Sequence, residues 1–176
     1  MKLITTHPSR SQISLAREQA EELGELRNSI EQGRGNVAGL LAEIMVAEAI
    51  GAEQVFGESY DYDLKLGRCL IEVKAAKTTV VPLEKYEGKV PEYQACHFYI
   101  FTRVLDDYSI LWIVGKIDAV RFEDESVRKL KGDRDGPFTY KRSCWTIPYS
   151  KLDDVTCNTN TRSNSFSDTS HASTAI

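Results

Sequence analysis

The clearest pattern in the chain is an alternation of hydrophobic and polar residues on both sides of one glycine. Residues 61–74 read DYDLKLGRCLIEVK, and the leucines before Gly67 share one parity while charged residues occupy the other. Alternation on both sides of a Gly-X pair is typical of a β-hairpin closed by a two-residue type II′ turn. The stretch therefore predicts two antiparallel strands joined at Gly67-Arg68.

The register of this hairpin follows from counting outward from the turn. The count places Asp63 directly opposite Glu72, and it places Asp61 opposite Lys74. Like charges in directly opposed positions destabilise a sheet. At about 5 Å and an effective dielectric constant near 20, the repulsion amounts to about 3 kcal/mol. A divalent cation between the carboxylates would reverse the sign of this interaction, so the register makes Asp63 and Glu72 candidate metal ligands.

Periodic apolar residues upstream of the hairpin predict two helices. From Gln12 to Gln32 they recur at steps of three or four, which is typical of an amphipathic helix, whereas residues 1–11 suggest a polar lead-in. The second helix, Val37 to Ile50, is apolar nearly all round, which predicts burial on most sides. Asn36 is expected to cap its start, and Gly51 is expected to end it.

Glu43 stands out because it lies inside this apolar second helix. A buried carboxylate needs a partner or a metal ion, since burying a charge alone is very costly. Glu48 is nearer the end of the helix, where its side chain can reach water more easily. Two interpretations of Glu43 remain open at this point: a metal-site ligand, or a glutamate at the helix surface paired with an arginine.

Downstream of the hairpin the pattern indicates further strands and one short helix. Cys96–Val104 is rich in aromatic and β-branched residues, which predicts a strand buried on both faces. A turn at Asp106-Asp107 leads to a neighbouring strand, Tyr108–Gly115. The remaining expectations are an irregular connection over Val80–Tyr93, a short helix over Ser126–Lys131 and a last strand over Thr139–Pro148.

Length and composition indicate one domain with a tail. Residues 1–156 are expected to form a single domain, with a helical extension over 1–35 and a core over 36–156. Residues 157–176 contain twelve Ser, Thr or Asn residues, which predicts disorder. The net charge of −4 argues against a strongly basic nucleic-acid coat but not against a local basic surface.

The same composition bears on the cellular compartment. The four cysteines contain no CxxC pair, so a zinc site built from them is not expected, and free thiols favour a reducing compartment. No apolar run is long enough to cross a membrane. We therefore expect a soluble, cytoplasmic protein with no membrane partner.

The order of acidic residues resembles that of the PD-(D/E)XK nuclease superfamily, especially its small phage and archaeal resolvase-like or restriction-like members. Glu43 matches the acidic residue that many members carry on the first helix, Asp63 matches the first motif acid, and Glu72-Val73-Lys74 matches E-x-K. The proline that names the motif is absent, because Tyr62 precedes Asp63. The resemblance covers residues 36–115 and implies an α/β, restriction-endonuclease-like core, with a central mixed sheet flanked by helices.

The resemblance also implies an activity, namely Mg²⁺-dependent hydrolysis of DNA to leave 5′-phosphates, with Mn²⁺ able to substitute. Asp63 and Glu72 would hold the metal together with the Val73 carbonyl, Glu43 would bind a second metal or orient a water, and Lys74 would assist the attacking water.

Several further expectations follow. Lys77 and Thr78 are candidates for phosphate contacts, and the alternative is that both are solvated surface residues. Cutting two strands would favour a homodimer, and a phage-encoded enzyme would act in the host cytoplasm. The alternative function is a catalytically inactive protein of the nuclease fold that binds DNA or a partner protein.

Overall fold

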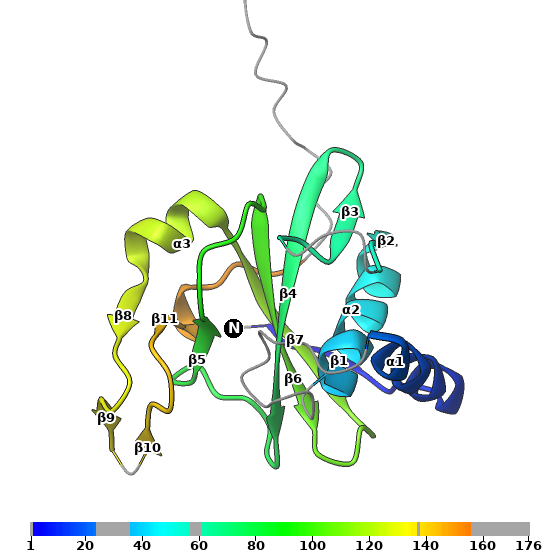
Figure 1. Ribbon diagram of the computed structural model, residues 1–176, viewed down its shortest axis with the longest axis horizontal. Coiled ribbons are helices and arrows are strands. Elements are labelled where there is room, and N and C mark those ends of the chain that lie inside the picture. The colour runs from blue at the N-terminus through cyan, green and yellow to red at the C-terminus, as the bar shows by residue number, and fades with distance from the viewer. Residues whose placement is uncertain (1, 24–35, 57–60, 137, 156–176) are drawn as a thin grey trace, which may run out of the picture.

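A six-stranded mixed β-sheet forms the centre of the protein, with two helices on one face and a smaller antiparallel sheet on the other (Figure 1). The computed structural model describes residues 2–23, 36–56, 61–136 and 138–155. The predicted continuation of the first helix to Gln32, the capping side chain of Asn36 and the tail 157–176 lie outside the described residues.

The central sheet has the strand order β1-β7-β6-β4-β3-β2. Only the pairing of β4 with β6 is parallel, and the other neighbours in this sheet are antiparallel. The bounds are β1 Ile4–Thr6, β2 Glu53–Gln54, β3 Leu64–Leu66, β4 Cys69–Thr78, β6 Phe98–Leu105 and β7 Leu111–Asp118. Strand β4 is thus an inner strand, with the hairpin partner on one side and β6 on the other.

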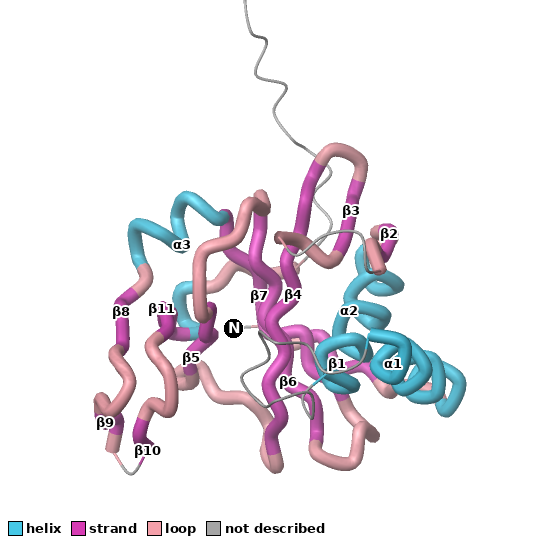
Figure 2. Tube along the Cα trace, viewed as in Figure 1, coloured by secondary structure: helices cyan, strands magenta, loops and turns pink. Residues whose placement is uncertain are grey.

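Helices α1 (Arg10–Leu23) and α2 (Asn36–Ile50) cover one face of the central sheet, as Figure 2 shows in cyan. Because α2 is apolar nearly all round, it packs both against α1 and against the sheet, and the positive φ of +70° at Gly51 ends it. No helix in the described ranges is long and apolar enough to cross a membrane.

The opposite face of the central sheet is covered mainly by strands. Strand β11 (Cys144–Pro148) pairs with β5 (Glu87–Val90) on one side and with β8 (Val127–Lys129) on the other. Helix α3 (Ala119–Glu125) precedes β8 in the chain, and the short hairpin of β9 (Arg134–Asp135) and β10 (Phe138–Thr139) follows β8. A second core fills this layer, built largely from aromatic side chains: Tyr99, Phe101, Phe122 and Tyr149.

Most of the predicted elements in the middle of the chain are confirmed. The hairpin forms, α2 has nearly the predicted bounds, and the strand predicted over Cys96–Val104 is β6, with β7 as its antiparallel neighbour. Strand β7 starts later than predicted because the turn continues through Tyr108, which has a φ of +64°. The general α/β expectation of a mixed sheet with N-terminal helices therefore holds.

Three predictions were wrong, each where the partner of a segment lies far away in the sequence. The supposed lead-in contains β1, which pairs with the edge strand β7, and α1 starts at Arg10. The irregular connection contains β5, which pairs with β11, whereas the predicted last strand is confirmed as β11 and only starts later than predicted, at Cys144. The helix predicted over Ser126–Lys131 is strand β8, while the helix lies earlier, at α3, where Asp118 caps it by accepting from Val120 N and Arg121 N.

A test of the packing between the two sheets uses Gly88 in β5. A Cβ at this position would lie 2.5 Å from Cε1 of Phe101, whose ring is buried in the second core. We expect Gly88→Ala to destabilise the protein by about 1–3 kcal/mol in urea unfolding, because the ring has no room to move. As a control, a Cβ at Gly39 in α2 meets no atom of the described structure within 4 Å, so Gly39→Ala should be neutral or stabilising by up to about 1 kcal/mol. Equal stability of Gly88→Ala and the unmodified protein would refute this packing.

Candidate metal centre

The hairpin has the register that the sequence predicts. Leu64 pairs with Ile71, Lys65 with Leu70 and Leu66 with Cys69. Gly67 has a φ of +60°, as a type II′ turn requires at its first central position. The described chain has one non-glycine residue with positive φ, and it is not Arg68, which excludes a type I′ turn here.

The pairing of β3 with β4 ends at Asp63. Its backbone N–H still donates to Ile71 O at 2.9 Å, but the next bond of the ladder is made by its side chain, since Asp63 Oδ2 accepts from Val73 N at 2.8 Å. In an extended strand the N–H and C=O of one residue point to the same side. The Val73 carbonyl is therefore directed to the same opened edge as the Asp63 carboxylate, as the metal-site hypothesis requires.

Glu72 and Lys74 lie on the face of β4 that looks away from the two N-terminal helices. Their register partners on β6 are Tyr99 and Phe101, which belong to the second core. Lys74 Nζ lies 2.5 Å from Glu72 Oε1, and the Glu72 residue is only 5% exposed. The other carboxylate oxygen, Glu72 Oε2, is buried and accepts no hydrogen bond from the described residues. One oxygen of Glu72 is thus paired with Lys74, and the other accepts no hydrogen bond from the described residues.

Glu43 approaches the site from α2, and its partner is an amide. Gln54 Nε2, from the short strand β2, donates to Glu43 Oε2 at 3.0 Å, and Gln54 also contacts Gln19 of α1. The arginine pairing left open by the sequence is therefore replaced by a contact with Gln54. Sequence analysis missed Gln54 because the two-residue strand that carries it has no periodicity. Glu48 is exposed, as expected, and accepts from Gln12 Nε2 at 2.6 Å.

The three carboxyl groups perturb one another. Burial, together with repulsion from Asp63 and Glu72, raises the pKa of Glu43 to about 8 against the opposing effect of Gln54 and Lys74. Burial, followed by repulsion from Asp63, raises the pKa of Glu72 to about 8, although Lys74 opposes this shift. Burial also raises the pKa of Asp63, against the hydrogen bond from Val73 N and the charge of Lys74. The three shifts show that Glu43, Asp63 and Glu72 act as one electrostatic cluster with too little positive charge.

The donors in this cluster suit a hard cation. They are carboxylate oxygens and one backbone carbonyl, the ligands that Mg²⁺ prefers. Among the described residues, no group of three or more His, Cys, Asp or Glu side chains is already arranged around one ion position. Glu72 Oε2 accepts no hydrogen bond from the described residues, and Glu72 and Asp63 are close enough to share a proton while one of them is protonated. When both are ionised they offer only acceptors to each other, and a cation fits between them. Asp63, Glu72 and the Val73 carbonyl are the groups that could hold it.

The other predicted residues lie outside this cluster. Lys77 is exposed on the helical face of β4, with its Nζ 4.8 Å from the centroid of the Tyr108 ring. Thr78 Oγ1 donates to Val80 O, so the hydroxyl is engaged in a local turn. Lys77 lies five residues beyond Glu72 along the strand, which corresponds to about 17 Å. Asp61 is exposed.

A pH titration of stability tests the cluster. A carboxyl group whose pKa is raised in the folded state keeps its proton on folding, so its contribution to stability is present below about pH 4.5 and is lost as pH rises toward 8. Glu43→Gln keeps an oxygen for Gln54 but cannot ionise. In metal-free buffer we expect this variant to gain at least about 1 kcal/mol relative to the unmodified protein between pH 5 and pH 8, measured by urea unfolding.

Glu48→Gln provides the matched control, because Glu48 lies on the same helix and also accepts from a glutamine amide, but is exposed. It should leave the pH profile unchanged. Parallel profiles for Glu43→Gln and the unmodified protein would show that Glu43 does not belong to a strained cluster.

Comparison with known proteins does not assign the chain to a family. No known family model matches the chain. No curated protein matches it either. The function therefore has to be inferred from the residues of the site and their surroundings.

Proposed function

We propose that this protein is a Mg²⁺-dependent DNA endonuclease that hydrolyses phosphodiester bonds. The observation that carries the proposal is the opened edge of the hairpin. There the Asp63 carboxylate accepts from Val73 N, the Val73 carbonyl is directed to the same edge, and the acids Glu72 and Glu43 are electrostatically coupled to Asp63, with Lys74 paired to Glu72. Such a set of hard oxygens with one ammonium group is suited to binding a divalent cation and an anionic phosphodiester.

The arrangement of elements supports a restriction-endonuclease-like core. Helix α2 is followed by an antiparallel meander of β2, β3 and β4, and then by β6 in parallel with β4. This order agrees with the helix, three-stranded meander and fourth strand of the PD-(D/E)XK superfamily. One difference is that the segment between β4 and β6 contains strand β5 in place of the second helix of that core.

In this proposal Asp63, Glu72 and the Val73 carbonyl hold Mg²⁺, with Mn²⁺ able to replace it. The bound ion would lower the pKa of a water ligand and neutralise charge on the phosphoryl oxygens. Asp63 keeps its orientation because Val73 N donates to it, and Glu72 keeps its orientation through Lys74. The hydrogen bonds of the strand therefore fix both acids before any ligand arrives.

Lys74 and Glu43 have supporting roles. The ammonium of Lys74 lies beside Glu72 at the opened edge, where it can donate a hydrogen bond to the attacking water and balance the carboxylates. To deprotonate that water, Lys74 would first have to lose its own proton and act as a neutral amine. Glu43 can orient a second water or a second cation, because its carboxylate is held by Gln54 and is electrostatically coupled to Asp63.

A binding protein of the same fold without hydrolytic activity is the second candidate. The observation in its favour is that the described carboxylates are not already arranged around one ion position, while Lys74 occupies one oxygen of Glu72. Titration calorimetry with Mg²⁺ and with Mn²⁺ separates the two functions. Absence of binding at millimolar metal would favour the second candidate.

Cleavage assays test the endonuclease directly. With labelled DNA and Mg²⁺, we expect Asp63→Ala and Glu72→Ala to abolish cleavage, because each removes an oxygen ligand. Lys74→Ala should lower the rate by about 100-fold or more, the usual effect of losing a proton-transfer group. Chelation of the metal should stop the reaction in the unmodified protein.

Asp61→Ala is the matched control, since it removes an exposed acid two residues from Asp63 and outside the ladder. It should cleave at nearly the unmodified rate. Cleavage that survives in Asp63→Ala, Glu72→Ala and Lys74→Ala would exclude this site as the catalytic centre.

A further inference from the structure

A pocket of about 370 Å³ lies at the edge of the second sheet, lined by aromatic, polar and charged side chains. It is bordered by Pro91, Glu92, Tyr93, Arg128, Ser143, Cys144 and Trp145. The rings of Tyr93 and Trp145 are stacked, with centroids 4.8 Å apart and planes inclined by 22°. Tyr93 remains 37% exposed, so a planar ligand in the pocket has an aromatic surface available to it.

A continuous series of contacts connects this pocket to the candidate metal centre. Glu72 on β4 is the register partner of Tyr99 on β6. The Tyr99 ring packs on Phe122 at a centroid distance of 4.9 Å, and Phe122 meets Tyr93 edge-on at 6.1 Å. Tyr99 Oη also accepts from the backbone N–H of Gln94, the residue after Tyr93. The pocket and Glu72 therefore belong to the same layer of the protein, between the central sheet and the second sheet.

Positive charge is concentrated around the pocket. Residues 127–145 contain six basic and two acidic side chains, a net charge of +4 in a chain whose total is −4. Arg128 lines the pocket, with its guanidinium 5.8 Å from the Trp145 ring centroid. Lys131 and Arg142 are exposed next to it, since Lys131 N donates to Ser143 Oγ and Arg142 precedes Ser143. No ion pair joins any of these three cations to a described carboxylate.

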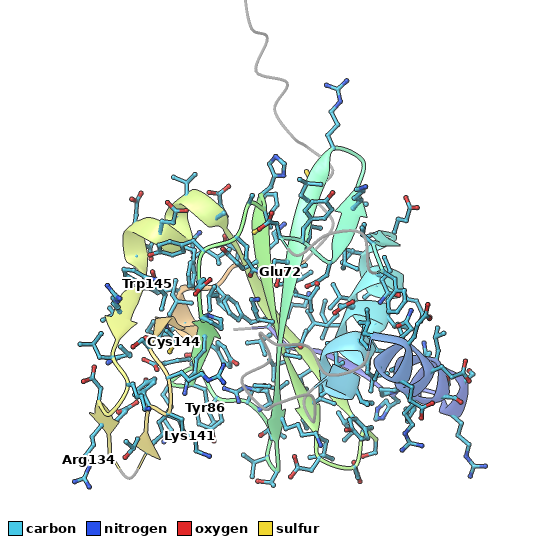
Figure 3. All side chains as sticks on the ribbon, in the orientation of Figure 1. Glu72, Tyr86, Arg134, Lys141, Cys144 and Trp145 are labelled. Carbon is cyan, nitrogen blue, oxygen red and sulfur yellow. The ribbon has the colours of Figure 1, made fainter. Side chains whose placement is uncertain are left out.

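Figure 3 shows how these residues extend from the pocket. Trp145 lies at the end of the second sheet near α3, and Arg134 and Lys141 lie toward the tip of the β9–β10 hairpin. Arg134 and Lys141 thus extend the basic residues of this segment from the aromatic pair toward the tip of the hairpin. A polyanion that has a planar group at one position is the chemistry that matches this combination.

We propose that this pocket binds an unpaired base of single-stranded DNA, which stacks against the Tyr93–Trp145 pair while Arg128, Lys131 and Arg142 contact the adjoining phosphates. Stacking on aromatic side chains together with a cationic track is the usual means of binding single strands, because every base has an aromatic face. A paired base cannot enter such a pocket without leaving its stack. The proposal extends the proposed nuclease function by assigning it a substrate with unpaired bases.

The experiment measures binding apart from cleavage. A fluorescein-labelled single-stranded 20-nucleotide DNA and the matching duplex are titrated with the full chain in EDTA, with fluorescence anisotropy as the readout. We expect the single strand to bind more tightly than the duplex. Tyr93→Ala should weaken single-strand binding by about 5-fold or more. Tyr93→Phe, which keeps the ring and loses only the hydroxyl contact with Ser126, should bind like the unmodified protein.

The phosphate contacts are tested by salt dependence. Each lost contact to a single strand lowers the slope of log K against log salt by about 0.7, so Lys131→Ala/Arg142→Ala should reduce it by about 1.4. The matched control is Arg10→Ala/Arg17→Ala, which removes two exposed arginines from α1 on the other side of the central sheet and should leave the slope unchanged. Arg128→Ala tests the third exposed cation, the one that lines the pocket and lies over the Trp145 ring, and should lower the slope by about 0.7.

The outcomes separate this inference from the proposed function. Three outcomes would each overturn the proposed binding of an unpaired base, even if cleavage is observed. They are equal single-strand affinity and salt slope in the pocket variants and the unmodified protein, tighter binding of the duplex than of the single strand, and no single-strand binding at all. The expected binding pattern in a protein that never cleaves DNA would support the pocket and contradict only the nuclease.

Discussion

The hydrogen bond from Val73 N to the Asp63 carboxylate determines how the site is built. It stands where a backbone carbonyl of β3 would otherwise continue the ladder, so the strand pairing ends there without leaving a buried donor unsatisfied. From that point β4 keeps only β6 as a neighbour, and the edge that faced β3 is opened. Both the position of Asp63 and the direction of the Val73 carbonyl follow from this one hydrogen bond, in which a side-chain oxygen accepts in place of a backbone carbonyl.

The opened edge also explains the electrostatic state of the cluster. Glu72 must be buried, because it alternates with Ile71 and Val73 on a strand that is covered on both faces. Its neighbour Lys74 neutralises one oxygen, but Asp63 and Glu43 bring two more carboxyl groups into the same region. The folded chain thus retains protons on acids that would ionise in water, a cost that a divalent cation would remove. Because the acids are buried side by side, binding of a cation there would relieve their mutual repulsion.

The local pattern predicted the hairpin and α2 well because their determinants are close together in the sequence. A Gly-X pair between alternating runs fixes both turn type and register, and an apolar 15-residue segment closed by Gly51 has few alternatives to a buried helix. The segments that were misjudged lack such determinants. Strands β1, β5 and β8 have no more than four residues each, and each exists because a distant strand supplies its hydrogen bonds.

By itself the sequence determined the register of the hairpin from Leu64 to Ile71 and the unusual position of Glu43 in an apolar helix. Counting from the turn also gave the prediction that Asp63, and not Asp61, lies opposite Glu72, because side-chain parity on a hairpin follows from the turn. Only the tertiary structure decided that Gln54 holds Glu43, that Glu72 Oε2 lacks a donor, and that Tyr93 and Trp145 come together near the same layer. These features depend on contacts between residues 11 to 52 positions apart, or on the absence of such contacts. A one-dimensional pattern does not encode them, since they are established when the two sheets and the helices pack.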